Sequence, residues 1–523
     1  MDGKEIVQIQ VLPEQLEDEA LIFNLAKQKS KKSDYTHFKI RKRSIDARRK
    51  PVKYNLQIVL DYESIPSKKY SFPHKNVSEK EEIHIVGAGP AGLFAALQAI
   101  ELDFKPIIYE RGKNVRERRR DLADLTKNGV VNPESNYCFG EGGAGTYSDG
   151  KLYTRSKKRG NVLKALEWLV RFGATEDILV DAHPHIGTNK LPQLITEIRL
   201  FIEKCGGEIN FHSKLTDITV EEDKIQSIEI NDSKIIKVNH LILATGHSAR
   251  DIFYLLNKEN IYIEPKGFAL GVRVEHPQEL IDKFQYHGDC DNDLLPPSSY
   301  SLVTQVNDTG VYSFCMCPGG IIAPCATSPN EVVTNGWSPS KRNNPFANSG
   351  IVVSLLPEDF ENPSDPFCGL NFQKKIEYDC WVAGGKNQFV PAQRLKDFVD
   401  NIKSESLPKS SYRPGIVSVN LNEILPASIA DKLRKAFLDF DKKMPGYLTN
   451  DAVIHAPESR TSSPVSIPRD RQGFNHVEVK NLYPCGEGAG YAGGIVSAAV
   501  DGMNCVEKGI LTRVSSKSHQ YKN

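Results

Sequence analysis

The sequence predicts an α/β protein, and three observations support this class. A short apolar strand at residues 83–87 is followed by a glycine-rich turn and an Ala/Leu-rich helix. A second strand at residues 106–109 follows that helix, and strands and helices continue to alternate up to residue 246. Residues 482–506 repeat the order of strand, glycine-rich turn and small-residue helix. Such alternation is typical of a parallel sheet with helices on its faces.

The first glycine-rich turn, GAGPAG, fits the pattern G-x-G-x-x-G in its expected context of strand, turn, helix and strand. Gly87 makes the tight turn, Gly89 lets the backbone approach a pyrophosphate, and Gly92 lets helix and strand pack closely. The pyrophosphate would lie at the N-terminus of the helix, which favours anions. Glu110 ends the second strand, where a carboxylate accepts hydrogen bonds from a ribose and disfavours a 2′-phosphate. We therefore expect a Rossmann-like dinucleotide-binding domain.

The composition is that of an ordinary globular chain. Its 523 residues suffice for two or three domains, and the net charge of +1 gives no strong bias toward nucleic acid or a membrane. No apolar run is long enough to span a bilayer, and the first residues, MDGKE, do not form a signal sequence. The ten cysteines show no disulfide framework. We expect a cytoplasmic protein with reduced thiols and no membrane contact.

The first 75 residues predict a small α+β domain, plausibly a split βαβ arrangement. Three strands and one helix are expected, at residues 5–11, 13–27 (the helix), 38–45 and 53–60. Between residues 27 and 53 lie twelve Lys and Arg residues but only Asp34 and Asp46. This segment is a candidate for binding RNA or another polyanion. A solvated face, or docking on an acidic patch of the main body, is favoured because no aromatic stacking pattern accompanies the charge. Residues 64–80 are interpreted as a linker.

Residues 137–154, YCFGEGGAGTYSDGKLYT, contain a second row of glycines. Gly140 to Gly145 formally fit G-x-G-x-x-G, but no strand precedes them and no helix-forming run follows. We reject a second Rossmann site and expect backbone N–H groups that approach a flat ligand.

The middle of the chain continues the α/β pattern and then changes character. Helices are expected at 163–172 and 190–204, strands at 208–212 and 238–246, and a three-stranded meander at 214–237. Residues 260–447 are rich in Pro, Asn and Ser and predict an inserted substrate domain with a mixed or antiparallel sheet. Its strands are expected at 269–274, 301–305, 311–315 and 350–355, and its helices at 392–403 and 425–441.

The C-terminal region returns to the first theme. A strand leads to Gly486-Glu487-Gly488, and a helix begins near Gly494. An acid between glycines, ahead of a helix N-terminus, suits the second edge of one extended dinucleotide site. Glu487 would hydrogen-bond a polyol hydroxyl while the helix dipole faces a ring oxygen or phosphate.

Together these motifs resemble the flavoproteins with two dinucleotide-binding domains. GAGPAG and Glu110 resemble their site for the FAD pyrophosphate and adenosine ribose, ILATG their internal ATG motif, and CGEGAGYAGG their ribitol motif, with Glu487 where Asp is common. Four segments further resemble the uncharacterised family of FAD-dependent (NAD/FAD-utilising) dehydrogenases: FGEGGAGTYSDGKL, FCMCPGG, APESRTSSPVSI and GEGAGYAGG. This resemblance covers residues 35 to 507, roughly the whole chain.

The resemblance implies a Rossmann-like FAD-binding domain (a ββα sandwich with a β-meander), an inserted mixed α+β substrate domain and a small N-terminal α+β appendage. The expected division is residues 1–75 for the basic domain, 82–257 for the first part of the FAD-binding domain, 258–449 for the inserted substrate or cap domain and 450–523 for the C-terminal part. The expected FAD contacts are Gly87, Gly89, Pro90, Ala91, Gly92, Glu110, Arg111, Gly142, Gly143, Ala144, Gly145, Thr146, Leu215 (by its backbone, on the adenine side), Ala244, Thr245, Gly246, Gly486, Glu487, Gly494 and Ile495.

Four residues are candidates for catalysis. Cys315 and Cys317 form a C-x-C pair that would be redox-active or metal-binding, although no suitable fourth ligand supports a structural zinc site and we expect no metal. The favoured alternative is one buried cysteine and one that faces a cleft, with no chemistry. Arg460 would hold a substrate carboxylate or the flavin edge, and His455 would transfer a proton. Equally weighted is a loop that fixes the substrate domain through buried ion pairs. Arg273 is more typical of a strand ion pair.

We therefore expect an FAD-dependent oxidoreductase that transfers a hydride between flavin and an unidentified small organic substrate. NAD(P)H is a candidate transient donor, since no second dinucleotide-binding domain is present. The alternatives are a flavoprotein that acts on RNA and a non-catalytic FAD-binding or sensing protein.

Overall fold

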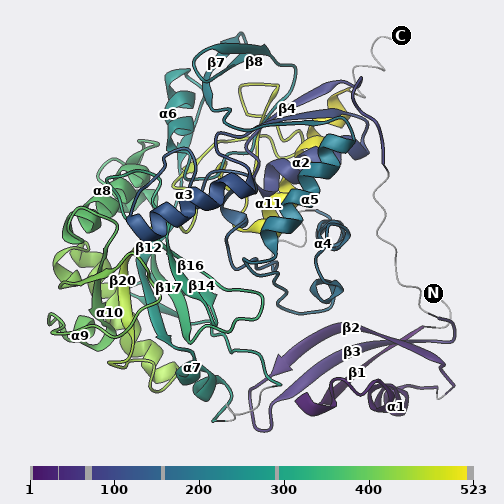
Figure 1. Cartoon of the computed structure of the whole chain (residues 1–523), viewed down its shortest axis with the longest axis vertical. Coiled ribbons are helices and arrows are strands. Elements are labelled where there is room, and N and C mark those ends of the chain that lie inside the picture. The colour runs from purple at the N-terminus through teal and green to yellow at the C-terminus, as the bar shows by residue number, and fades with distance from the viewer. Residues whose placement is uncertain (1–3, 33, 65–73, 155–159, 289–293, 515–523) are drawn as a thin grey trace.

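The computed structural model describes residues 4–514 except 33, 65–73, 155–159 and 289–293. Much of the predicted linker at residues 64–80 lies outside the described residues. Figure 1 shows a small N-terminal sheet below, a sheet wrapped by helices above, and a larger sheet to the left. Within the described ranges, no helix combines the length and apolar character needed to cross a membrane.

The upper sheet has five parallel strands in the order β22-β10-β4-β5-β6. Its strands are β4 (Glu82–Val86), β5 (Lys105–Tyr109), β6 (Glu208–Asn210), β10 (Leu241–Leu243) and β22 (Leu482–Pro484). Because parallel strands end at one edge, the turns that follow β4, β10 and β22 meet there. The GAGPAG, ATG and GEG motifs therefore lie together although they are far apart in the sequence.

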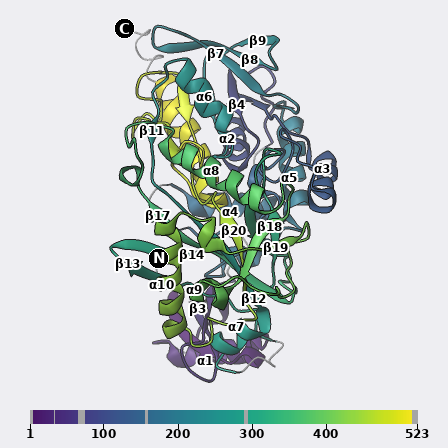
Figure 2. The same cartoon turned by 90° about the vertical axis from the view of Figure 1, so that its left-hand side faces the viewer.

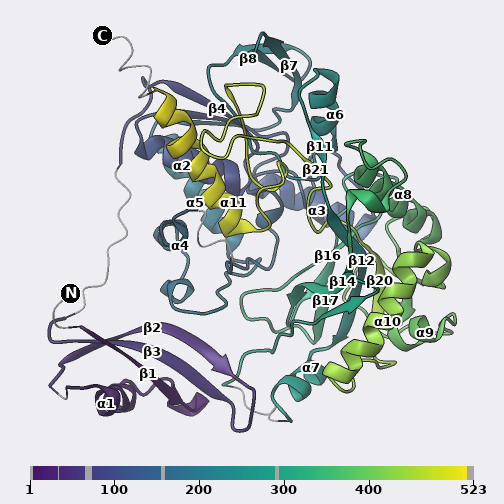
Figure 3. The same ribbon diagram turned by 180° about the vertical axis from the view of Figure 1, so that it is seen from behind.

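Two helices with small residues cover one face of this sheet and pack against each other (Figure 3). They are α2 (Pro90–Glu101) and α11 (Ile495–Asn504), which continues as a π-helical turn over Cys505–Ile510. A β-carbon at Gly502 would lie 2.1 Å from the carbonyl oxygen of Ala91. Only glycine permits this approach of the two backbones. The remaining helices of this part are α3 (Val115–Asn128), α4 (Val162–Arg171), α5 (Leu191–Lys204) and α6 (Arg250–Lys258).

The predicted meander covers the opposite face. Its strands are β7 (Leu215–Glu221), β8 (Lys224–Ile230) and β9 (Lys234–Lys237). Ile218 and Ile228 of the meander are buried in one cluster with Ile107 and Leu243 of the sheet. Alternating apolar residues on short strands thus form a second layer over the parallel sheet.

The inserted region and residues 453–458, which were expected to belong to the C-terminal part, form a seven-stranded sheet in the order β13-β14-β17-β12-β20-β18-β19, antiparallel except for β18 and β19. Its strands are β12 (Phe268–Pro277), β13 (Val303–Val306), β14 (Thr309–Cys317), β17 (Phe346–Leu355), β18 (Val390–Arg394), β19 (Ile416–Ser418) and β20 (Val453–Glu458). Helices on its outer side are visible in Figure 2: α8 (Cys368–Ala383), α9 (Leu395–Asp400) and α10 (Ala427–Lys443). Smaller elements are α7 (Gln278–Gln285) and the strand pairs β11 (Glu264–Pro265) with β21 (Val465–Ser466) and β15 (Ile321–Pro324) with β16 (Thr334–Trp337).

The expected helix at residues 392–403 is wrong at its start. Residues 390–394 form strand β18 between β20 and β19, and only Leu395–Asp400 are helical. Val390 and Ala392 are buried in this sheet, so pairing with neighbouring strands overrides a local preference for helix.

The N-terminal part contains β1 (Glu5–Val11), α1 (Glu19–Lys29), β2 (His37–Asp46) and β3 (Lys53–Asp61). Because β3 lies between β1 and β2 and is antiparallel to both, the latter two are parallel, which is a split βαβ arrangement. Arg43 joins this part to the main body, with its Nε 2.7 Å from Asp181 and its Nη2 3.0 Å from Asp177. Through Arg43, the basic segment thus docks on an acidic patch formed by Asp177 and Asp181.

The contact between α2 and α11 generates a first prediction. Gly502→Leu places a side chain against the backbone of Ala91, so the helices must separate, and we expect a loss of at least about 1–3 kcal/mol of stability. Urea unfolding measures this loss. Glu507→Ala, an exposed change at the end of the same helix, is the control. Equal unfolding midpoints for both variants would show that the close approach is unimportant.

Candidate functional site

The GAGPAG turn has the geometry that its glycines predict. Gly87 has a φ of +105°, and a β-carbon at Gly92 would lie 1.9 Å from the carbonyl oxygen of Gly87. At Gly89, by contrast, the nearest atom to an added β-carbon is the Cα of Gly143, 4.0 Å away. Gly87 and Gly92 are thus required by the fold, whereas Gly89 faces space at the N-terminus of α2, where an anion is favoured.

Glu110 is buried and holds two glycine-rich segments in place. Its Oε2 accepts a hydrogen bond from the N–H of Ala88 at 2.9 Å, and its Oε1 accepts from Gly112 and Gly140, also at 2.9 Å. A carboxylate has about four acceptor positions, so one remains for a ribose hydroxyl. The contact of Glu110 with a ribose stays a prediction. Its hydrogen bonds to the backbone of Ala88, Gly112 and Gly140 give it a structural role that the sequence did not predict.

The second glycine row folds against the starts of both helices. The N–H of Gly142 donates to the carbonyl of Ala88 at 2.8 Å, and β-carbons at Gly143 and Gly145 would lie 3.1 Å from Gly89 Cα and Pro90 Cγ. The segment is fixed by Thr146, whose buried hydroxyl donates to the carbonyl of Glu141 at 2.7 Å. This confirms the rejection of a second strand–turn–helix motif, because the row forms a short 3-10 turn at Gly143–Gly145.

Arg118, which the sequence analysis did not single out, provides the clearest test for a bound anion. Its fully buried side chain donates to the carbonyls of Asn136, Glu141 and Gly143 at 2.8–2.9 Å. Its Nη2 is buried with no hydrogen-bond partner, and no carboxylate pairs with it, among the described residues. Burial lowers the pKa of the guanidinium. A buried cation without an anion is costly, so the site fits a diphosphate. The sequence feature that could have pointed to Arg118 is the basic run VRERRR, which follows the second strand.

The C-terminal motif completes the same edge. The N–H of Gly486 donates to Oδ2 of Asp501 at 2.8 Å, and a β-carbon at Gly488 would lie 1.9 Å from the carbonyl oxygen of Thr245. The GEG turn therefore packs on the predicted ATG segment, where Ala244 is buried. Open space begins at three glycines, where an added β-carbon would meet nothing within 4 Å: Gly246, Gly493 and Gly494.

Asp501 is a further residue that the sequence analysis missed. Arg469 donates to both of its carboxylate oxygens, at 2.9 and 2.5 Å, and so fixes the GEG turn indirectly. Cys485, Asp501 and Cys505 have ligand atoms within 4.8 Å of one another. A metal cation there would meet the guanidinium of Arg469, so we assign no metal to this cluster.

Glu487 lies half-buried beside Lys266. Burial raises the pKa of Glu487 to about 7, against the opposing charge of Lys266. Burial also lowers the pKa of Lys266. Near neutral pH the carboxyl of Glu487 is thus partly protonated and can either donate to or accept from a polyol hydroxyl.

Four more predicted FAD contacts lie in the described residues, and their contacts with the cofactor stay predictions: Arg111, Leu215, Ala144 and Ile495. Arg111 binds Glu134 at 2.6 Å and Asp251 at 2.8 Å, and it lies over the ring of Phe139. Its side chain therefore supports the site. Leu215 begins β7 and is buried, and its contact with adenine stays a prediction. Ala144 is exposed in the second glycine row, and Ile495 is the first residue of α11.

The two candidate cysteines differ in exposure. Cys317 is buried, 3.2 Å from the carbonyl of Cys315, and burial raises its pKa to about 11. Cys315 is an exposed residue with a φ of +47°. Its sulfur is nevertheless poorly solvated, and this desolvation raises the pKa of its thiol. Both are protonated at neutral pH, so neither is an activated nucleophile. This geometry supports the interpretation of one buried and one exposed cysteine without activated chemistry, and the cleft beside Cys315 stays a prediction.

Arg460 is wholly engaged by protein groups. It donates to Glu377 at 3.1 Å, to Glu331 at 2.6 Å and to the hydroxyl of Thr327 at 2.9 Å. Arg250 of α6 binds the same two carboxylates, at 3.0 Å (Glu331) and 2.6 Å (Glu377). These four charges, which we call the interdomain ion network, support the alternative of a loop that joins the domains, and Arg460 is not available to substrate.

His455 and Arg273 are likewise structural. His455 is fully buried between the hydroxyl of Ser410, at 2.8 Å, and the carbonyl of Arg273, at 3.2 Å. Burial lowers its pKa to about 4, so it is neutral and has no route to a substrate proton. Arg273 forms a two-point ion pair with Glu458 at 2.7 and 2.9 Å, as expected of a strand ion pair.

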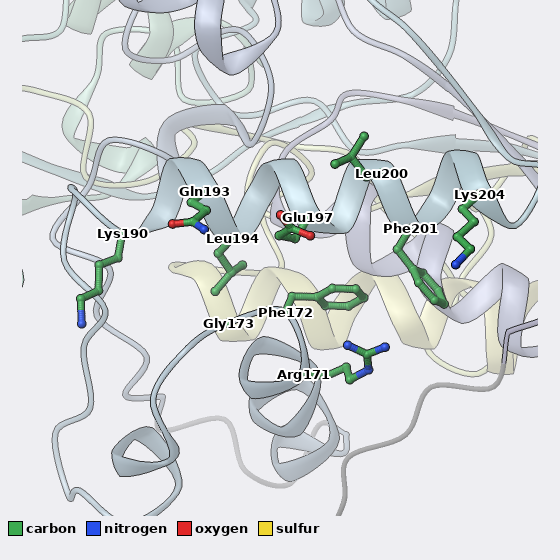
Figure 4. Close-up of a pocket in the computed structure, with 10 residues that line it drawn as sticks. All are labelled: Arg171, Phe172, Gly173, Lys190, Gln193, Leu194, Glu197, Leu200, Phe201 and Lys204. Atoms are coloured by element: carbon green, nitrogen blue, oxygen red, sulfur yellow. The ribbon is translucent and has the colours of Figure 1, made fainter.

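A groove of about 630 Å³ lies apart from these motifs, between the end of α4 and α5 (Figure 4). Phe172, Leu194 and Phe201 supply apolar surface, and the rim carries Arg171 and Lys204. None of the predicted site residues lines it, so we do not assign the redox site to this groove.

The sheet order, the glycine turns and Arg118, unpaired among the described residues, have the arrangement expected of a Rossmann-like dinucleotide-binding site. Residues 267–461 match the family described as FAD-dependent protein, C-terminal domain-like, and residues 4–61 match a domain of unknown function. An uncharacterised protein of Clostridium beijerinckii is 41% identical over 497 residues, which cover 91% of this chain and 92% of that protein. The chain belongs to the same family as this protein.

Similar solved structures are distant. They include glycine oxidase from Bacillus cereus (13% identity, 82% of this chain and 94% of the other, TM-score 0.28) and the tetracycline destructase Tet(51) (12%, 84% and 84%, TM-score 0.32). CtdE in complex with FAD is 11% identical over 82% of each chain, with a TM-score of 0.30. Similarity at this level says nothing about the substrate.

The open space at Gly89 generates a second prediction. Gly89→Val should abolish FAD retention while leaving the fold intact, because the new side chain enters ligand space and touches no other element. The released flavin per protein, with the circular dichroism spectrum, measures both effects. Gly310→Ala in β14, where the nearest atom is 3.4 Å away, is the control. Stoichiometric FAD in the Val variant would refute this placement of the cofactor.

The pKa of Glu487 generates a third prediction, for the FAD-free protein. In the unfolded chain this carboxyl has the usual pKa of 4.5, whereas burial raises its pKa to about 7 in the folded protein. The folded state therefore holds the proton more tightly, and the protein becomes less stable as the pH rises from 4.5 to 7. The Glu487→Gln variant has no ionisable group at this position, so it does not lose stability in this way as the pH rises. We expect the variant to gain stability relative to the parent between pH 4.5 and 7 and to hold that gain above pH 7. Urea unfolding at several pH values tests this, and a constant difference would contradict it.

Proposed function

We propose that the protein is an FAD-dependent oxidoreductase that transfers a hydride between the flavin and a small organic substrate. The observation that carries this proposal is Arg118, a buried guanidinium without a counter-ion, directly behind two glycine-rich turns that leave space for a ligand. FAD supplies the redox chemistry when bound, and the protein binds and orients it.

The residues of the chain have separable tasks in this proposal. The N-terminus of α2 and Arg118 hold the diphosphate, because both present N–H donors and positive charge. Glu110 offers its remaining acceptor position to the ribose, and Glu487 contacts a hydroxyl of the ribityl chain. The N-terminus of α11 stabilises negative charge that develops at the far end of the cofactor.

The inserted domain provides the other wall of the site. The interdomain ion network joins α6 of the FAD-binding part to Glu331 and Glu377 of the inserted part. Removing one partner would leave an uncompensated buried charge, at a cost of about 3–5 kcal/mol. The domain is therefore held in one position relative to α6.

Binding of RNA is the weaker alternative. The open face of the N-terminal sheet pairs Gln8 with Gln57 and Gln57 with Lys42, so these side chains share one side. No Phe, Tyr or Trp of the described strands lies on that side, where His37 is the one ring that a base could stack on. The exposed Arg41 and Arg49 keep a polyanion as a candidate partner.

A fourth prediction tests the redox proposal. The purified protein should show flavin absorbance and release FAD, not FMN, on denaturation. We expect anaerobic addition of NADH or NADPH to bleach the flavin band, since the cofactor edge at Gly493 and Gly494 is open. Bound flavin that neither nucleotide bleaches would point to another electron partner or to a non-catalytic protein.

A further inference from the structure

A charged cluster lies where the FAD-binding part meets the inserted domain. Asp149 and Lys151 come from the segment that follows the second glycine row, and Arg342 comes from the loop between β16 and β17. Lys151 donates to the carbonyl of Met316, near the end of β14. We call Asp149, Lys151 and Arg342 the junction cluster.

The contacts inside the junction cluster are loose. Oδ2 of Asp149 lies 3.4 Å from Nζ of Lys151 and 3.5 Å from Nη2 of Arg342. Charge-assisted hydrogen bonds are normally about 2.7–2.9 Å long. Among the described residues, Oδ1 of Asp149 and Nε of Arg342 are buried without any hydrogen-bond partner. The interdomain ion network, by comparison, uses every donor of Arg460. In the junction cluster, Nε of Arg342 is thus the donor that a bound anion could accept from.

The charges of the junction cluster do not cancel. Burial raises the pKa of Asp149, but Lys151 and Arg342 more than offset this, so the pKa is lower than usual and the carboxylate is ionised. His185 faces the cluster, and burial lowers its pKa, so it is neutral at neutral pH. Cys317, 3.8 Å from Lys151, is a neutral thiol. Two cations and one anion therefore leave one excess positive charge.

The junction cluster is partly exposed and shares a chain segment with Gly145, which lies beside α11. The segment that carries it starts at Gly145, where an added β-carbon would lie 3.5 Å from Ile495 at the start of α11. Lys151 contacts Met316, and the residue before it, Cys315, is exposed. The side chain of Lys151 is itself 36% exposed. The exposed part of the Lys151 side chain is therefore within reach of a small molecule.

We propose that Lys151 and Arg342 form a subsite for the carboxylate of a small organic acid, which makes the substrate anionic. This inference rests on the proposed oxidoreductase function and specifies its substrate class. The planar guanidinium of Arg342 matches a carboxylate, and the single excess charge suits a monoanion better than a dianionic phosphate. Asp149 is a positioning residue that holds both cations.

The test uses the full-length, FAD-loaded protein and benzoate as the probe, with benzamide as its neutral counterpart. Isothermal titration calorimetry should show benzoate binding at least about tenfold more tightly than benzamide. Arg342→Gln and Lys151→Met should each weaken benzoate about tenfold or more and leave benzamide unchanged. Lys341→Gln, an exposed change beside Arg342, is the matched control and should leave both unchanged.

Several outcomes separate the possibilities. Equal affinity for benzoate and benzamide, or benzoate binding that survives both substitutions, would overturn the subsite. If the variants only lowered the unfolding temperature while the ratio of the two dissociation constants stayed constant, the junction cluster would be a structural joint and the proposal would fail. Absence of bound FAD in the starting spectrum would defeat the oxidoreductase proposal instead, and the calorimetry would still report on the subsite.

Discussion

The carboxylate of Glu110 is the contact on which the site depends. Through the N–H groups of Ala88, Gly112 and Gly140 it joins the GAGPAG turn, the end of β5 and the second glycine row. Three backbone hydrogen bonds to one buried charge fix the relative position of segments that have few side chains of their own. A residue that the motif assigns to a ligand therefore also builds the cradle, which explains why glycine-rich segments without side-chain packing keep a defined shape.

The partners of the arginines distinguish contacts of the scaffold from candidate ligand sites. Arg273, Arg460 and Arg469 each meet at least one carboxylate at 3.1 Å or less, and these pairs compensate their charge internally. Arg118 meets only carbonyl oxygens, and Arg342 meets its carboxylate at 3.5 Å. Because a poorly compensated charge away from water is unfavourable, the buried Arg118 and the half-buried Arg342 mark places where an anion would complete the structure. One lies behind the cofactor turns and the other lies beside the inserted domain.

The sequence predicted motifs and elements that depend on neighbouring residues. It missed the contacts between residues that only folding brings together. GAGPAG, the meander and the helix after Gly494 were visible because glycine position and apolar periodicity act within about twenty residues. Arg460 was left undecided because its partners Glu331 and Glu377 lie far from it in sequence. The contact between Asp149 and Arg342 spans 193 positions and has no local signature. Strand β18 was mistaken for helix because its environment comes from β19 and β20.

The position of the inserted domain limits how a substrate enters. Four buried charges join it to α6, so swinging it away would expose or unpair each of them. Any movement that accompanies substrate binding would therefore involve loops and not separation of the domains. The segment of residues 145–151 is suited to this, because its charged end is only loosely paired. An anion that bound there would tighten the contacts of Lys151 and Arg342, and it would order the wall of the site at the moment the substrate arrives.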